Sequence, residues 1–188
     1  MFFDELDAFV SGFRTREFNP KEMTKREEDD IIDELLDLYL LAYYEGSQDA
    51  ARELLIDVEP SVRDAGEIIN KPIDGKTYKE RVREYLNGEM GETTGTPAEA
   101  IARVADTDSV RIYNEAKLTV AKGNGAKTKT WHTMEDNKVR DTHVVLDGVT
   151  APIDGYFYTY TGERAQAPGQ FGSASEDVNC RCYLKFSK

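Results

Sequence analysis

Hydrophobic and polar side chains alternate with a helical period through most of the first two thirds of the chain. Apolar residues recur every three or four positions, which is the spacing of one face of an α-helix. The stretches that show this spacing are 4–13, 31–43, 78–86 and 97–122. The sequence therefore predicts a run of amphipathic helices before residue 123.

The boundaries of two of these helices carry their own signals. We expect Asn19 to cap the second helix with Pro20 at its first position, and Gly46 to interrupt it so that residues 48–56 form a further helix. The segment Thr96-Pro97-Ala98-Glu99 has the pattern of a capping box with Pro at the first helical position. A long central helix should begin there and end near Lys122.

The pattern changes after residue 126. Residues 128–133 alternate around Trp131 as a strand does, and a last strand is expected over residues 180–186. The residues between them are rich in Gly and Pro, which is typical of loops. The expected fold class is α+β, with a helical N-terminal arm and long central helix followed by a small loop-rich β unit. We expect two domains, an acidic helical arm over 1–95 and a second domain over 96–188, with a hinge in the Gly/Thr-rich segment 91–96.

One face of the central helix is polar. Arg103, Thr107 and Asn114 follow one another at i, i+4 and i+11, so they share one side of a helix. They are either plain surface or a polar ridge that bonds to the C-terminal segment.

Charge is placed unevenly along the chain. The formal net charge is −12, and residues 1–65 alone hold 18 acidic and 7 basic side chains. This acidity disfavours direct nucleic-acid binding and suits contact with a basic protein surface, although a solvated face has the same composition. No apolar run approaches the roughly 20 residues of a membrane span, so no membrane partner is expected. The sequence leaves a homo-oligomer open.

The chemically capable residues gather late in the chain. The only Trp, both His and both Cys lie between residues 129 and 182. Cys180 and Cys182 are too close in sequence for an unstrained disulfide, and reduced thiols indicate synthesis in the cytoplasm. No Walker, Rossmann, HExxH or GxSxG motif is present.

A metal site is one interpretation of this segment. On a strand the two thiols would point to one face, and with His143 or His132 they could hold Zn²⁺ in a tetrahedron. Asp136, Asp147 or water would be the fourth ligand. The alternative, which we favour, is that both Cys are small buried side chains and that His143 is hydrogen-bonded in a core, so that no cofactor is needed.

Catalysis is a second interpretation. Asp136, Arg140 and His143 fall at i, i+4 and i+7, so a helix there would align them for proton transfer, as in a small hydrolase or nuclease-like domain. A Cys with a His would also permit a nucleophile and its base. The competing interpretation is a structural network of polar side chains that fixes the loops and satisfies their backbone groups. Its expected members are Arg103, Asp136, Arg140, His143, Asp147, Asn179 and Arg181.

The order of these residues resembles that of a known family. The series begins with Trp131, Asp136, Arg140, His143 and Asp147-Gly148, continues with Pro168-Gly169, and ends with Asn179-Cys180-Arg181-Cys182. It is similar to the phage Mu F-like minor head protein family, which has a phage head morphogenesis domain. The preceding helix, with Arg103, Thr107, Tyr113, Asn114 and Ala116, is similar to the family's lead-in helix. The resemblance covers roughly residues 98–183.

The resemblance implies a non-enzymatic minor head protein of a tailed phage or prophage, made in the bacterial cytoplasm and located inside the phage head. It implies contact with the portal or the major capsid protein during assembly, and packaging with the DNA in some cases. The alternatives to a head protein are the hydrolase or nuclease-like domain and a zinc-stabilised interaction module.

Overall fold

The computed structural model describes residues 2–19, 21–89 and 95–188, and it confirms the α+β class. The long helices come first and the strands follow. The helices are α1 (Phe2–Arg14), α2 (Lys25–Leu54), α3 (Val62–Ile69), α4 (Tyr78–Leu86), α5 (Pro97–Gly123), α6 (Asp141–Val144) and α7 (Ala174–Asp177). The strands are β1 (Thr128–His132), β2 (Thr150–Pro152), β3 (Phe157–Tyr158), β4 (Arg164–Ala165) and β5 (Tyr183–Ser187).

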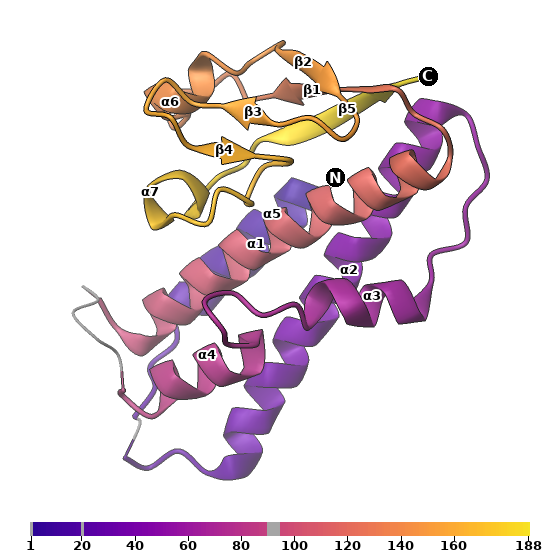
Figure 1. Ribbon diagram of the computed structural model, residues 1–188. Coiled ribbons are helices and arrows are strands. Elements are labelled where there is room, and N and C mark those ends of the chain that lie inside the picture. Colours follow the sequence, from indigo (N-terminus) through magenta and orange to yellow (C-terminus); the bar gives the residue numbers. More distant parts are fainter. Residues whose placement is uncertain (1, 20, 90–94) are drawn as a thin grey trace.

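Helix α5 runs through the centre of the molecule. Figure 1 shows the strands on one side of α5 and the helices α3 and α4 on the other. Helix α5 begins as the sequence predicts, because Thr96 accepts a hydrogen bond from Glu99 N and the Glu99 carboxylate accepts one from Thr96 N. This reciprocal pair satisfies two backbone donors that a helix start leaves unpaired. Most of the side chains on α5 are buried.

Helix α2 packs along α5, and it corrects two of our predictions. It begins at Lys25 with Thr24 as its cap, whereas Asn19 accepts a hydrogen bond from Lys21 N in the preceding turn. It also continues through Gly46 to Leu54 without a break. A Cβ atom at position 46 would collide with the carbonyl oxygen of Tyr113, so this glycine lets the two helices approach closely.

Some predicted features lie outside the described residues. These are Pro20 and residues 91–94 of the expected hinge. The division of the chain between residues 95 and 96 therefore stays a prediction.

The C-terminal unit is built around β1. Strand β1 pairs antiparallel with β2 on one side and with β5 on the other, and Trp131 lies opposite Leu184. Strands β3 and β4 form a separate antiparallel pair. The last strand begins at Tyr183, three residues later than predicted, so both Cys precede it.

The buried apolar side chains form two clusters. The first contains side chains from each of the five helices α1, α2, α3, α4 and α5. The second lies between the strands and the C-terminal ends of α2 and α5. Polar groups also connect the two parts, because Asn114 on α5 donates to the carbonyl oxygen of Cys182 and accepts from Leu184 N. Asn114, one of the three residues of the predicted polar ridge, thus forms hydrogen bonds with the C-terminal segment. Within the described ranges, no helix combines the length and the apolar character that crossing a membrane requires.

Candidate functional site

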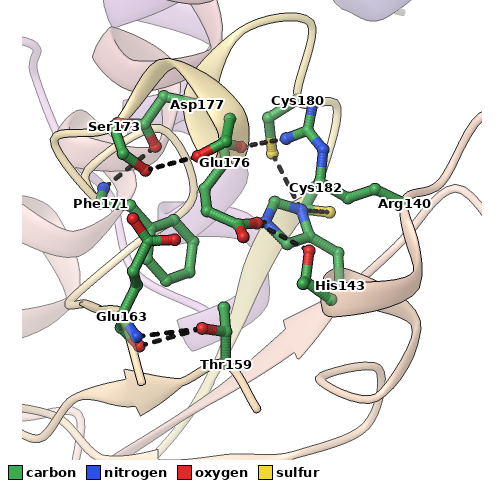
Figure 2. A network of polar contacts seen from close by, with 12 residues as sticks. Arg140, His143, Thr159, Glu163, Phe171, Ser173, Glu176, Asp177, Cys180 and Cys182 are labelled. Carbon is green, nitrogen blue, oxygen red and sulfur yellow. Dashed lines mark hydrogen bonds and ion pairs between the residues drawn. The ribbon is translucent and has the colours of Figure 1, made fainter. Parts of the chain in front are cut away.

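The two Cys and one of the two His meet in the interior of the C-terminal unit. His143 comes from α6, whereas Cys180 and Cys182 lie between α7 and β5 (Figure 2). The Nδ1 atom of His143 is 3.6 Å from Sγ of Cys180 and 3.5 Å from Sγ of Cys182. His143 is 1% exposed and each Cys is 3% exposed. The three side chains therefore form a compact group that the surrounding core encloses, and we call it the His–Cys–Cys cluster.

Aromatic rings and one carboxylate fix the orientation of the His143 ring. The Trp131 ring meets it edge-on at 5.3 Å and the Phe171 ring stacks on it at 5.5 Å, both measured between ring centroids. Its Nε2 atom lies 3.0 Å from Oε2 of Glu176. Thr142 Oγ1 donates to the same oxygen at 2.7 Å. The ring thus turns Nδ1 towards the thiols and Nε2 towards Glu176.

Arg140 ties α6 to α7. Its guanidinium donates to the carbonyl oxygen of Glu176 and, at 2.5 Å, to that of Val178. Both acceptors belong to the end of the short helix α7, where carbonyl groups lack partners within the helix. Arg140 therefore satisfies backbone groups that the loop itself cannot pair.

The chain around α7 is held in a second way. The carboxylate of Asp177 accepts from Phe171 N at 3.0 Å and from Gly172 N at 2.7 Å. Burial raises the pKa of Asp177, although these two N–H groups act to lower it. Asn179 follows with a φ of 55°, a left-handed conformation that Asn tolerates better than most residues. This turn directs the chain into Cys180.

The two thiols of the cluster affect one another's pKa. A hydrogen bond from Cys180 lowers the pKa of Cys182. The same hydrogen bond, together with complete burial, raises the pKa of Cys180. The hydrogen bond between the thiols thus shifts the pKa values of Cys182 and Cys180 in opposite directions.

The remaining predicted site residues lie in other local contacts. Asp136 forms an ion pair of 2.5 Å with Arg181, and that hydrogen bond lowers the pKa of Asp136. Asp147 accepts from Thr133 N at 2.7 Å and from Thr133 Oγ1. Arg103 is half-buried on α5. The common bracing role of these residues stays a prediction.

Glu176, which contacts His143, was not among the predicted residues. It is one of many carboxylates in an acidic chain, and it precedes Cys180 by four positions in a segment without a clear period. A buried carboxylate in a four-residue helix gives no pattern that the sequence alone would distinguish from a solvated one.

Comparison with known proteins places this site within a family. The family described as Phage Mu protein F like protein matches residues 67–185, which is more than half of the chain. The chain belongs to this family. The matched segment contains α5, β1 to β4, the first three residues of β5 and every residue of the His–Cys–Cys cluster.

Two curated relatives match part of the chain. The NAD(+)--arginine ADP-ribosyltransferase EFV of Enterococcus faecalis is 37% identical over 116 residues, which make up 61% of this chain and 23% of that protein. Minor head protein GP7 of Bacillus phage SPP1 is 31% identical over 83 residues, which make up 43% of this chain and 27% of that protein. The matched parts are thus about a quarter of each relative's length. No solved structure matches the chain.

The structure does not align Asp136, Arg140 and His143 on one helical face, as the catalytic interpretation predicted. Helix α6 spans only Asp141–Val144, so Asp136 is not on a common helical face with His143. Asp136 pairs with Arg181, and Arg140 is bonded to backbone carbonyls. The cavity bordering the His–Cys–Cys cluster measures about 10 Å³, which is too small for a substrate. A more open hollow of about 440 Å³ is lined by residues between Arg16 and Glu34, outside the Mu F-like segment.

Proposed function

We propose that this protein is a minor head component of a tailed phage or prophage that acts without enzymatic activity. It would contact the portal or the inner surface of the capsid during head assembly and remain inside the head, in some cases with the packaged DNA. The observation that carries this proposal is the family match over residues 67–185. The partial match to a phage minor head protein supports it as well.

The geometry of the C-terminal unit supports a structural role. A catalytic His must reach a substrate, whereas His143 is enclosed by Trp131, Phe171 and Glu176. The nearby Cys thiols are equally enclosed, which argues against a nucleophile and base pair. The relative named as an ADP-ribosyltransferase does not change this inference, because the match covers 23% of that protein.

The outer face of α2 is the surface that we assign to the partner. Its exposed positions include Asp30 and Asp37 and, one and two turns further on, Leu40 and Tyr44. These residues follow one another at helical spacing, so they form one acidic and apolar stripe. A basic surface with an apolar centre on the portal or capsid protein would complement this stripe, whereas the phosphates of DNA would be repelled.

Co-expression with the portal and with the major capsid protein of the same phage tests this proposal. We expect the protein to co-purify with one of them and to be detected in purified heads by mass spectrometry. The double substitution Asp30→Lys and Asp37→Lys should weaken the isolated complex at least about tenfold, since like charges across an interface cost several kcal/mol. The matched control is Asp57→Lys with Glu59→Lys, which makes the same change of charge in the exposed segment after α2.

Two results would count against the proposal. Absence from purified heads together with no binding to either protein would remove the head function itself. Equal weakening by both double substitutions would show that overall charge, rather than the face of α2, determines binding.

A further inference from the structure

We propose that the His–Cys–Cys cluster is a zinc site in which His143 Nδ1 and the thiolates of Cys180 and Cys182 bind one Zn²⁺ ion. The three atoms lie within 4.8 Å of one another and come from two segments that are far apart in the sequence. The metal would fasten α6 to the segment that enters β5. This proposal does not depend on the function proposed above.

The distances between the ligand atoms fit a tetrahedral ion. Zinc binds Cys sulfur at about 2.3 Å and His nitrogen at about 2.0–2.1 Å, so a tetrahedron separates the sulfur and nitrogen by about 3.6 Å. The observed separations are 3.6 Å and 3.5 Å. Both sulfur–nitrogen separations therefore match those of a tetrahedral site, and the two sulfur atoms lie within 4.8 Å of one another.

Hydrogen bonds between the two thiols and from one thiol to Nδ1 also gather these groups, but they require only one sulfur at Nδ1. Nδ1 has one lone pair in the tautomer that carries its proton on Nε2, so it accepts from one S–H group. Yet Nδ1 lies at almost the same distance from both sulfur atoms. A single metal ion accounts for both contacts, because each of the three atoms is then a ligand.

The groups around the cluster are those that a zinc site needs. A His that binds metal through one nitrogen usually presents the other to a carboxylate, and Nε2 of His143 lies 3.0 Å from Glu176. Thr142 in turn donates a hydrogen bond to the same carboxylate oxygen. Arg140 lines the same small cavity as the three ligand residues and places a positive charge beside them. The charges of two thiolates and Glu176 are balanced by those of Zn²⁺ and Arg140.

Water completes the coordination in our proposal. Among the described residues, no carboxylate joins His143, Cys180 and Cys182 within ligand distance of one another. Asp136 and Asp147, which the sequence offered as a fourth ligand, are bonded to Arg181 and Thr133. The cavity of about 10 Å³ beside the cluster has room for about one water molecule. The sequence also offered His132, but its ring stacks on Tyr183 instead.

Metal content and a spectroscopic probe test the proposal on the whole chain. Protein purified under reducing conditions without chelator should contain about one zinc per chain by mass spectrometry. After removal of zinc, Co²⁺ should give the thiolate-to-cobalt charge-transfer band and the strong visible bands of a tetrahedral site. Zn²⁺ should then displace Co²⁺ and abolish these bands.

Variants assign the ligands. Cys180→Ser and Cys182→Ser should each lose the charge-transfer band or weaken it strongly, and His143→Gln should lose zinc. Glu176→Gln should retain the site with a zinc affinity about 10–100-fold lower, because it removes only the carboxylate that contacts Nε2 of His143. His132→Gln is the matched control and should bind like the unsubstituted protein.

The proposal fails if the unsubstituted, reduced protein contains no zinc and shows no tetrahedral Co²⁺ spectrum. This outcome needs no variant, so misfolding of a substituted chain cannot obscure it. A cobalt spectrum that persists in the Cys180→Ser and Cys182→Ser variants would equally overturn the assignment.

Discussion

The helical part and the C-terminal unit of this protein satisfy their backbone groups by different means. In α1 to α5 the backbone pairs within each helix, and the inward side chains are free to form a continuous apolar cluster. In the C-terminal unit the strands are short and side chains complete the pairing, as Arg140 does for two carbonyl groups and Asp177 for two N–H groups. Polar side chains in this unit thus supply backbone hydrogen bonds that the helices provide for themselves.

The two parts meet through contacts of both kinds. Apolar side chains at the ends of α2 and α5 pack on the strands, while Asn114 pairs with the backbone of Cys182 and Leu184. Lys117 on α5 is buried beside Glu53 on α2, whose carboxylate also accepts from Phe186 N. Burial lowers the pKa of Lys117, and the nearby Glu53 carboxylate partly offsets this lowering. We therefore expect the two parts to unfold together.

The largest effect should come from the apolar core of the helices. Leu35→Ala should lower the free energy of unfolding by about 3–5 kcal/mol, because Leu35 is 0% exposed and its loss leaves a cavity. Leu40→Ala on the same helix is the matched control, since Leu40 is 41% exposed. Urea denaturation followed by circular dichroism and by Trp131 fluorescence measures both variants.

The two signals also test the coupling of the two parts. Trp131 lies in the C-terminal unit, whereas the circular dichroism comes mainly from the helices. Coincident transitions in Leu35→Ala would show that the parts unfold together. A helical transition that shifts while the fluorescence transition stays in place would separate them.

A smaller effect is expected for the polar counterpart in the C-terminal unit. Arg140→Ala should cost about 2–4 kcal/mol, because it leaves two carbonyl groups without their donor and each part-buried group costs about 1–2 kcal/mol. Incorporation into phage heads should fall in parallel with stability. Arg164→Ala is the control, because that exposed Arg lies over the ring of Tyr156 and should contribute under about 1 kcal/mol. A stable Arg140→Ala protein would refute the bracing role.

The sequence predicted the helical part better than the C-terminal unit for a physical reason. Helix faces and the capping box at Thr96 are local patterns, and the structure confirms α5 from Pro97 to Gly123. The prediction that Gly46 interrupts α2 was wrong. A glycine is needed there because the backbone of Tyr113, 67 positions away in the chain, approaches closely. No local pattern can report such a contact.

The candidate site shows the same limit. Rare residue types identified His143, Cys180 and Cys182, although the strand argument that joined the two Cys was wrong because β5 begins at Tyr183. Residue types could not distinguish His143 from His132 or reveal Glu176. These depend on how α6 and α7 fold over β1, which is a matter of long-range packing.

The smallest of the three effects concerns a carboxylate at the junction of the two parts. Asp106 on α5 is 6% exposed, and burial, together with the charge of Asp7, raises its pKa from 3.8 to about 6, although Arg14 and Arg181 act to lower it. The folded protein therefore holds a proton that the unfolded chain releases near pH 4, so stability should fall as the pH rises from about 4 to about 6. Asp106→Asn should remove this dependence and raise the free energy of unfolding at pH 7 by about 1–3 kcal/mol, since each pKa unit corresponds to about 1.4 kcal/mol. Thermal melts between pH 4 and pH 7 measure the slope, with Asp7→Asn expected to reduce it less. An unchanged slope in Asp106→Asn would mean that Asp106 is ionised in the folded protein and that the two Arg side chains outweigh its burial.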